Sequence, residues 1–201
     1  MEIRELSVPG AFAMTPKIIG DSRGAFLEWF RADRFSEVTG HPFTIAQANS
    51  SISSAGTVRG VHFADLPPSQ AKYVTALSGS FVDFVIDIRV GSATFGQWDS
   101  VLLDTVDRRA VYLAEGLGHA ICSLQDASPV TYLCSATYNP AREHAVNPLD
   151  PELDLVLPTG VTPVLSAKDA AAPSLREAAA AGLLPRYDEC VRYYAELASR
   201  R

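Results

Sequence analysis

The sequence has few cysteines and no long apolar run, and each shortage excludes a class of protein. Cys122, Cys134 and Cys190 are odd in number, widely spaced and set among apolar neighbours. Such a pattern is typical of buried, reduced thiols and fits neither a disulfide framework nor a zinc site. No apolar run approaches the roughly 20 residues of a membrane-spanning helix. Residues 1–5 carry charges where a signal peptide is apolar, so we expect a cytoplasmic protein that does not bind a membrane.

Positive charge is also scarce, because 17 Lys and Arg stand against 23 Asp and Glu, for a net charge of -6. This balance argues against general nucleic-acid binding, and an anionic small molecule would need a local basic cluster. The chain has 201 residues, 47% of them hydrophobic, and can bury a full core without disulfides or a structural metal. No repeat or linker divides it. We expect one domain over residues 1–201, with a core at about 16–165 and a helical segment at about 170–201.

Alternating apolar residues in the middle of the chain predict β-strands. Between residues 81 and 90 the even-numbered positions are apolar, whereas Asp83, Asp87 and Arg89 share the other face. Further strand-like runs, separated by turn residues, are 44–50, 71–77, 97–103, 110–113, 119–124 and 130–138. Many short strands at this spacing predict an all-β fold, either a double-sheet jelly roll or a barrel.

Helices are expected only at the flanks. A short helix at residues 32–39 would end at Gly40. Ser174 and Glu177 have the spacing of a capping box that opens an alanine-rich helix, which Gly182 would stop. Residues 188–200 have the pattern of a second terminal helix.

Histidine is rare, and one of the four in the chain lies with Arg59 in the apolar strand at residues 58–63. An imidazole titrates near neutral pH, so His62 could take and return a proton. Arg59 offers a fixed charge and several donors for a carboxylate, phosphate or enolate oxygen. A lone histidine in such a strand is more often a core residue, and alternation would put Arg59 and His62 on opposite faces. If both reach one ligand, the strand must bend or bulge at Gly60.

Polar and aromatic residues that interrupt the apolar pattern are further candidates for a functional site. In strands they are Phe26 and Glu28, which share a face, Gln47 and Asn49, which also share a face, Lys72, Tyr132 and Tyr138. In a turn and a loop they are Arg23 and the adjacent pair Lys168 and Asp169. Taken singly, each of these is more often a surface, turn or core residue than a functional one.

The histidines do not form the pattern of a metal site. A cupin-type metal centre takes two histidines one residue apart, a carboxylate shortly afterwards and a later histidine. Ala64 stands where the partner of His62 would be, although His119 could be the later ligand. Two imidazoles without a matching carboxylate suit neither zinc nor iron, so we expect a site without metal.

Several stretches of the sequence occur together and in a characteristic order. They are Asp21-Ser22-Arg23-Gly24, Gln47-Ala48-Asn49, Val58-Arg59-Gly60-Val61-His62-Phe63, Asp87-Ile88-Arg89, Ser92-Ala93-Thr94-Phe95-Gly96-Gln97-Trp98, Glu115-Gly116-Leu117-Gly118-His119 and Leu165-Ser166-Ala167-Lys168-Asp169. On these stretches the chain resembles the dTDP-4-dehydrorhamnose 3,5-epimerase family, over about residues 16–173. The resemblance implies a cupin-like jelly roll that epimerises a dTDP-4-keto-6-deoxyhexose without a cofactor.

The same resemblance assigns roles to individual residues. It implies that His62 is the base that removes a proton beside the C4 ketone, and that Asp169 orients this histidine. Tyr132 matches the acid that returns a proton to the opposite face, and Lys72 matches the cation near the C4 oxygen. Substrate-binding positions of the family are matched by Arg23, Phe26, Glu28, Gln47, Asn49, Arg59, His119, Tyr138, Glu143 and Lys168. Family members are dimers with exchanged N-terminal strands, which implies a homodimer here, with Arg23 and Glu28 available to the neighbouring site.

The resemblance leaves the precise reaction open. The proline-rich segment 64–72 and the extension at 184–201 resemble the family branch that makes deoxysugars for bacterial secondary metabolites such as antibiotics. Enzymes of that branch act on C3, on C5 or on both; we expect inversion at C3 and leave C5 open. A dTDP-sugar 3,4-ketoisomerase is the enzymatic alternative, although its usual pair of histidines in one strand is absent. A non-catalytic sugar-nucleotide-binding module would lack His62 or Asp169, and both are present.

Overall fold

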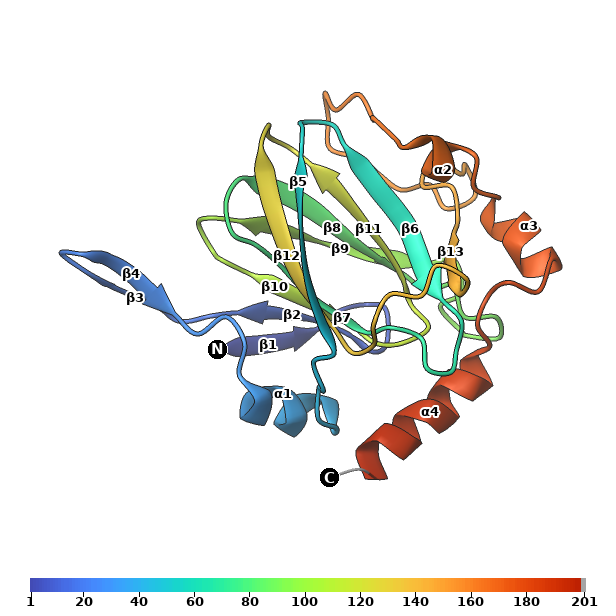
Figure 1. Ribbon diagram of the computed structural model, residues 1–201, viewed down its shortest axis with the longest axis horizontal. Helices are drawn as coiled ribbons and strands as arrows, with labels where there is room; N and C mark the ends of the chain where they lie inside the picture. Colours follow the sequence, from blue (N-terminus) through green and yellow to red (C-terminus); the bar gives the residue numbers. More distant parts are fainter. Residues whose placement is uncertain (200–201) are drawn as a thin grey trace.

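Two antiparallel β-sheets face each other in the computed structural model, which describes residues 1–199 (Figure 1). The six-stranded sheet has the order β1 (Glu2–Glu5), β2 (Ala11–Thr15), β10 (Ala110–Leu113), β7 (Lys72–Ala76), β12 (Ser128–Cys134) and β5 (Gln47–Ser53). The five-stranded sheet has the order β13 (Glu143–Ala145), β6 (Val58–Ala64), β11 (Gly118–Ser123), β8 (Ser80–Ile86) and β9 (Trp98–Asp104). The predicted all-β fold of the jelly-roll kind is confirmed.

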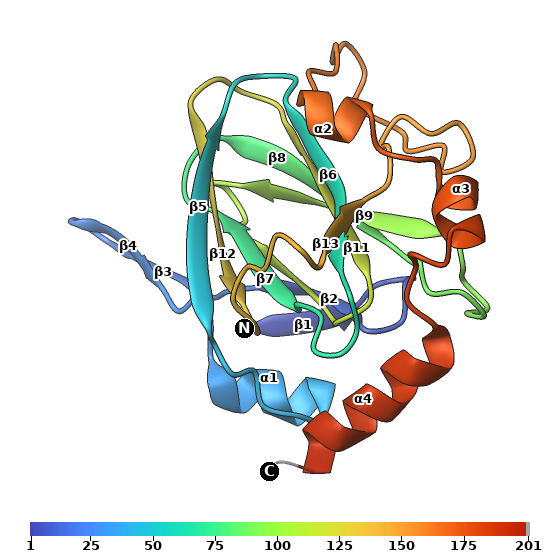
Figure 2. The same ribbon diagram turned by 45° about the vertical axis from the view of Figure 1, so that its right-hand side comes forward.

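Helices flank this sandwich, as the sequence predicted (Figure 2). α1 (Ala32–Thr39) and α4 (Tyr187–Ser199) lie at one end, whereas α2 (Ala167–Ala170) and α3 (Leu175–Ala180) lie along the five-stranded sheet. None of the helices within residues 1–199 is long and apolar enough to cross a membrane.

The predicted helix ends are correct to within one or two residues. α1 ends at Gly40, whose φ of 83° is left-handed and thus suits glycine. Ser174 and Glu177 form the predicted capping box at the start of α3. α4 begins one residue earlier than predicted, and Arg200, the predicted last residue, lies outside the described part of the chain.

Two predicted strands end early because side chains redirect the backbone. β8 stops at Ile86, since the Asp87 carboxylate accepts hydrogen bonds from the side chains of Arg89, Ser92 and Thr94 and holds the chain in a turn. β12 stops at Cys134, which leaves Tyr138 in a loop and corrects its predicted place in a strand. The N–H of that tyrosine donates to the Gln47 side chain at 2.8 Å instead of joining a ladder.

Two further predictions of local structure are wrong. Glu28 lies beyond the strand β4 (Gly24–Leu27), where its carboxylate is 3.5 Å from the Arg31 guanidinium. Lys168 and Asp169 lie in α2 and not in a loop, because Ser166 caps this helix and accepts a 3.0 Å hydrogen bond from the Asp169 N–H. The single turn is too short to be evident from apolar periodicity.

Both faces of the five-stranded sheet are buried, and this decides where the polar side chains of β8 lie. Phe84 and Ile86 pack outwards in a cluster with Leu175 of α3. Phe81 and Val85 belong to the cluster between the sheets, and Asp83 shares their face. Asp83 is fully buried. The polar face predicted from alternation is therefore turned into the sandwich and not to solvent.

The irregularity predicted at Gly60 is present in β6. His62 pairs with His119 of β11 whereas Arg59 pairs with Ile121, so β6 has one extra residue between these pairs. The φ of Gly60 is 127°, and a Cβ there would lie 2.4 Å from the His119 carbonyl oxygen. Only glycine fits this bulge, and the bulge lets Arg59 and His62 line one cavity.

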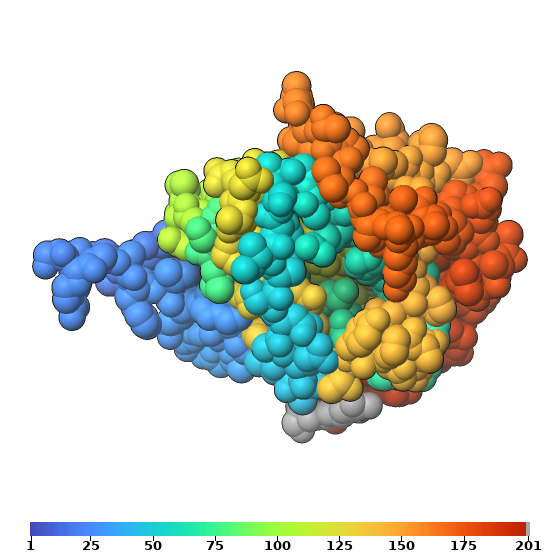
Figure 3. All heavy atoms as spheres, turned by 45° about the horizontal axis from the view of Figure 1, so that its top comes forward, coloured from blue at the N-terminus to red at the C-terminus, as the bar shows by residue number. Residues whose placement is uncertain are grey.

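A hairpin of β3 (Ile18–Asp21) and β4 extends away from the sandwich (Figures 1 and 3). Its apolar side chains are bare in the single chain, with Ile19 55% and Phe26 66% exposed. Apolar side chains exposed together on a projecting element mark an interaction surface. This hairpin, residues 18–27, is called the arm below.

Replacing Gly60 with alanine should destabilise the protein strongly. The new Cβ would meet the backbone of β11, and φ would stay in the left-handed region, so we expect a loss of about 3 kcal/mol or more in the free energy of unfolding. Gly91→Ala is the control, because φ there is 92° and a Cβ would meet nothing within 4 Å; it should cost about 1–2 kcal/mol. Urea denaturation measures both, and equal losses would contradict the role of the close contact at Gly60.

Candidate active site

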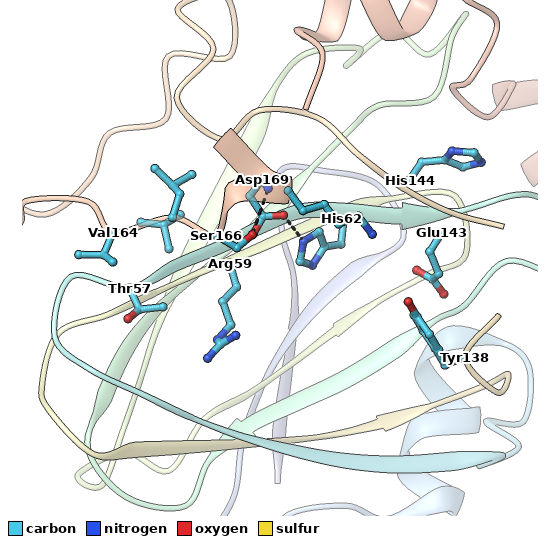
Figure 4. A pocket seen from close by; sticks show the side chains of 12 residues that line it. Thr57, Arg59, His62, Tyr138, Glu143, His144, Val164, Ser166 and Asp169 are labelled. Carbon is cyan, nitrogen blue, oxygen red and sulfur yellow. Dashed lines mark hydrogen bonds and ion pairs between the residues drawn. The ribbon is translucent and has the colours of Figure 1, made fainter. Parts of the chain in front are cut away.

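The cavity beside β6 brings many of the predicted site residues together (Figure 4). It has a volume of about 360 Å³, and Figure 3 shows the surface hollowed between β5 and the segment before α2. Its lining includes the predicted residues Arg59, His62, Tyr138, Glu143, Lys168 and Asp169. Unpredicted neighbours in the lining are Thr57, Val58, His144, Val164, Leu165 and Ser166.

His62 and Asp169 form a close pair on the wall of this cavity. His62 Nε2 lies 2.7 Å from Asp169 Oδ1, and the aspartate is only 4% exposed. A dashed line marks this hydrogen bond in Figure 4. Burial alone would raise the pKa of the Asp169 carboxyl. The hydrogen bond and positive charge of His62, together with the Ser166 hydroxyl and the Gly60 N–H, outweigh burial and bring this pKa below its ordinary value.

The charged aspartate fixes the tautomer of the histidine. A carboxylate only accepts hydrogen bonds, so the proton of a neutral His62 ring stays on Nε2. Nδ1 is then the nitrogen that can take a proton from a ligand. His62 is about one-third exposed, with 35% of its side chain accessible, whereas its partner is shielded. This arrangement is that of an oriented general base.

The facing sheet presents a second group of predicted residues through cross-strand pairing. Lys72 of β7 pairs with Cys134 of β12, which pairs in turn with Gln47 of β5. Tyr132 pairs with Asn49 in the same way. Directly paired residues share a face of the sheet, so these five side chains lie on one surface.

The electrostatics of this surface link it to the cavity. Burial lowers the pKa of the Lys72 ammonium, while the carboxylates of Glu143 and Asp83 oppose the shift. Burial also raises the pKa of the Tyr132 hydroxyl. The tyrosine therefore holds its proton at neutral pH and can donate it.

His119 and Asp83 form a second histidine–aspartate pair inside the sandwich. His119 Nε2 is 2.8 Å from Asp83 Oδ2, and the two residues are 8% and 0% exposed. His119 lies directly across from His62 in the ladder, but it is enclosed and does not line the cavity. Among the described residues there is no group of three or more His, Cys, Asp and Glu side chains that could hold a metal ion.

Two predicted binding residues in the arm, and a third directly after it, lie outside the cavity lining of their own chain. Arg23 pairs with Asp21 at the tip at 2.5 Å, and Phe26 is exposed. Glu28 lies at the base beside Arg31. The structure of one chain thus places Arg59 and Glu143 in the cavity, but not Arg23, Phe26 or Glu28.

Cys134 is the main residue of the site that the sequence analysis missed. It was interpreted only as a buried thiol, yet it lies between Lys72 and Gln47 and receives a 3.7 Å contact from the Asn49 amide. Burial raises the pKa of this thiol to about 11, so it stays neutral. Its spacing of two residues from Tyr132 was the available signal, because such residues share a face of a strand.

His144 in the cavity lining is a further residue that the sequence analysis did not single out. It lies in β13, and its Nε2 is 2.6 Å from Asp65 Oδ1, in the loop that precedes Lys72. No local sequence pattern links residues 79 positions apart, and only the pairing of β13 with β6 brings them together.

A double-sheet fold with an oriented histidine base on one sheet and a protonated tyrosine on the facing sheet defines an acid–base enzyme of the jelly-roll class. A family model described as dTDP-4-dehydrorhamnose 3,5-epimerase matches residues 5–177. The chain belongs to this family of epimerases, which are isomerases, as the resemblance predicted.

Similar proteins come from Mycobacterium and from Streptomyces. The dTDP-4-dehydrorhamnose 3,5-epimerase of Mycobacterium tuberculosis is 55% identical over 199 residues, which is 98% of each chain. The crystal structure of NovW, a 4-keto-6-deoxy sugar epimerase from the novobiocin biosynthetic gene cluster of Streptomyces spheroides, is 53% identical, with a TM-score of 0.92 and coverage of 94% and 95%. ChmJ, a 3'-monoepimerase from Streptomyces bikiniensis in complex with dTDP-quinovose, is 44% identical, with a TM-score of 0.94 and coverage of 96% and 98%.

Proposed function

We propose that this protein inverts C3 of dTDP-4-keto-6-deoxy-D-glucose in the biosynthesis of a deoxysugar, without a cofactor. The observation that carries the proposal is the His62–Asp169 pair on the wall of a cavity large enough for a sugar. The names of the relatives support the substrate class, because they act on or bind dTDP-sugars. We further propose that the reaction takes place in the cytoplasm.

The ketone of this substrate makes the chemistry possible with acid–base groups alone. A carbonyl at C4 acidifies the C–H bonds at C3 and C5, since the electron pair left by the proton moves onto the C4 oxygen as an enolate. His62 Nδ1 takes the proton, and the Asp169 carboxylate stabilises the imidazolium that forms. Tyr132 then donates its proton to the opposite face of C3, which inverts the centre. Such acid–base catalysis contributes about 10²–10⁴-fold.

Positive charge near the C4 oxygen supplies the electrostatic part of catalysis. Lys72 lies on the same face of the six-stranded sheet as Tyr132, outside the lining of the His62 cavity. Its half-buried position would strengthen its attraction to an enolate bound between the sheets. Because burial lowers the pKa of this ammonium, the favourable charge is lost earlier on the alkaline side than for an exposed lysine. Arg59, on the other wall, is an exposed cation suited to a diphosphate oxygen.

The remaining predicted residues fit the nucleotide and the sugar. We assign Gln47, Asn49, Arg59, Tyr138, Glu143 and Lys168 to substrate contacts within one chain, and leave out the enclosed His119. We also propose a homodimer in which the arm enters the neighbouring site. The exposed apolar side chains of the arm support this, and so does the distance of Arg23, Phe26 and Glu28 from their own cavity. A dimer would bury the arm and supply each cavity with a further basic residue.

The names of the relatives differ in the carbon atoms that are epimerised. The Mycobacterium tuberculosis relative is named a 3,5-epimerase, whereas ChmJ is called a 3'-monoepimerase. The same histidine and tyrosine serve either outcome, because C3 and C5 flank one ketone. We therefore propose proton abstraction beside the C4 ketone, with C3 as the inverted centre.

Incubation with dTDP-4-keto-6-deoxyglucose in D₂O should place deuterium at C3, read by proton NMR. The reason is that every turnover replaces the abstracted hydrogen with one from solvent. Deuterium at C3 alone assigns a 3-epimerase, and deuterium at C3 and C5 assigns a 3,5-epimerase. A product with the carbonyl moved to C3 would favour a ketoisomerase, and no exchange at either carbon would refute an epimerase.

Mixed dimers should show that the arm serves the partner's site. Arg23→Ala and His62→Asn should each be nearly inactive as homodimers. A mixed dimer, purified with two different affinity tags, would contain one site with both native residues and should regain about half of the wild-type activity.

The matched control combines two variants whose altered residues lie in the same chain's site. A mixed dimer of His62→Asn with Tyr132→Phe has no intact site and should stay inactive. If the Arg23→Ala and His62→Asn pair also stays inactive, Arg23 does not act across the dimer.

A further inference from the structure

Glu115 is a buried acidic residue that the proposed mechanism does not use. It lies in the turn between β10 and β11 and is 2% exposed. The Ser135 hydroxyl donates to its Oε1 at 2.8 Å. Burial raises the pKa of the Glu115 carboxyl, with hydrogen bonds from Ser135 and the backbone acting against it. A buried carboxyl is costly to desolvate unless hydrogen bonds compensate for the lost water.

Ser135 connects this carboxyl to the backbone directly before Lys72. Its Oγ accepts a 2.9 Å hydrogen bond from the Ala71 N–H, and its own N–H donates to the Ala71 carbonyl at 3.1 Å. The serine side chain thus replaces a main-chain acceptor where the β7–β12 ladder ends. The next pair in that ladder is Lys72 and Cys134.

The turn that carries Glu115 is itself anchored from the C-terminal helix. The Tyr194 hydroxyl of α4 donates to the Glu115 carbonyl. A Cβ on Gly116 would lie 2.4 Å from Cys190 Sγ, so α4 packs directly on the turn. On the other side, the Gly116 N–H donates to Ser69 Oγ at 3.2 Å, in the loop that leads to Lys72. The turn therefore contacts the segment before Lys72 at two points, Ser69 directly and Ala71 through Ser135.

These contacts lie on the side of the sheet away from the substrate. Ser135 follows Cys134, so its side chain points to the opposite face of the strand. A cavity of about 230 Å³ on that face is lined by Glu115, Ser135 and Leu197 of α4, among others. Neither Glu115 nor Ser135 lines the cavity that contains His62.

We infer that Glu115 and Ser135 are positioning residues that hold the start of β7, and with it Lys72, in place for catalysis. The inference rests on the proposed function, in which the Lys72 ammonium stabilises an enolate at C4. A lysine side chain is long and flexible, so the placement of its backbone decides how accurately the charge meets the oxygen. Displacement of about 1 Å at a catalytic group lowers the rate by up to about 10²-fold.

Ser135→Ala should lower kcat about tenfold while KM and dTDP affinity change less than about twofold. The variant loses the hydroxyl that fixes Ala71 but no group that touches the substrate. Ser128→Ala is the matched control, because Ser128 opens β12, the strand that ends directly before Ser135, is 1% exposed and donates one hydrogen bond to the Gln125 carbonyl at 3.0 Å. Ser128→Ala should lose a similar free energy of unfolding and keep the wild-type kcat. Ser135→Thr, which keeps a hydroxyl, should recover most of the kcat that Ser135→Ala loses.

A second readout follows Lys72 without any turnover. The chain contains only Lys17, Lys72 and Lys168, so an NMR spectrum of lysine labelled with ¹³C at Cε has few signals, and Lys72→Arg assigns the relevant one. Its position and pH titration should change in Ser135→Ala and Glu115→Leu, and remain as in wild type in Ser128→Ala. If Ser135→Ala does not fold, Ser135→Cys, whose thiol is a weaker acceptor, takes its place.

The outcomes separate this inference from the proposed function. An unchanged kcat and an unchanged Lys72 signal in Ser135→Ala would overturn the positioning role, even if the wild type exchanges C3. A wild type that fails to exchange C3 or C5 would refute the function, while a shifted Lys72 signal would still support the contact between Ser135 and the start of β7.

Discussion

The hydrogen bond between His62 Nε2 and Asp169 Oδ1 is the contact on which the rest of the site depends. It joins β6 to α2 across 107 positions of sequence, and two local features make it possible. The bulge at Gly60 turns His62 toward the cavity, and the Ser166 cap fixes α2 so that Asp169 faces the ring. With the aspartate charged and shielded, the histidine has one tautomer and a single free nitrogen.

The sandwich divides the chemistry between its two sheets. In the proposed mechanism the base, His62, belongs to the five-stranded sheet, whereas the acid Tyr132 and the cation Lys72 belong to the six-stranded sheet. An acid and a base on facing sheets can reach the two faces of one sugar ring, which inversion requires. Burial affects both side chains of the six-stranded sheet. It raises the pKa of Tyr132, which stays protonated, and it strengthens the attraction of the Lys72 ammonium to a nearby negative charge.

Local patterns in the sequence predicted the fold, and the family resemblance implied the pairing of His62 with Asp169, but neither predicted the contacts that depend on register. Gly60 was predicted to bulge because Arg59 and His62 otherwise face apart, and β6 confirms it. The pairing of Asp83 with His119, and the place of Cys134 beside Lys72, follow from which strands are neighbours. The alternation of apolar and polar residues along a strand predicts the face on which each side chain lies, but not which strands pair with each other. The one-turn helix α2 depends on a side-chain cap and not on periodicity, so Asp169 was expected in a loop.

The most direct test of the central claim compares His62→Asn with wild type in two measurements on the same samples. Deuterium incorporation at C3 from D₂O should fall at least about 10³-fold, because asparagine cannot take the proton. The affinity for dTDP should stay within about twofold, since His62 is assigned to proton transfer and not to the nucleotide. Exchange at a near-wild-type rate in a folded His62→Asn variant would contradict the assignment of this histidine as the base.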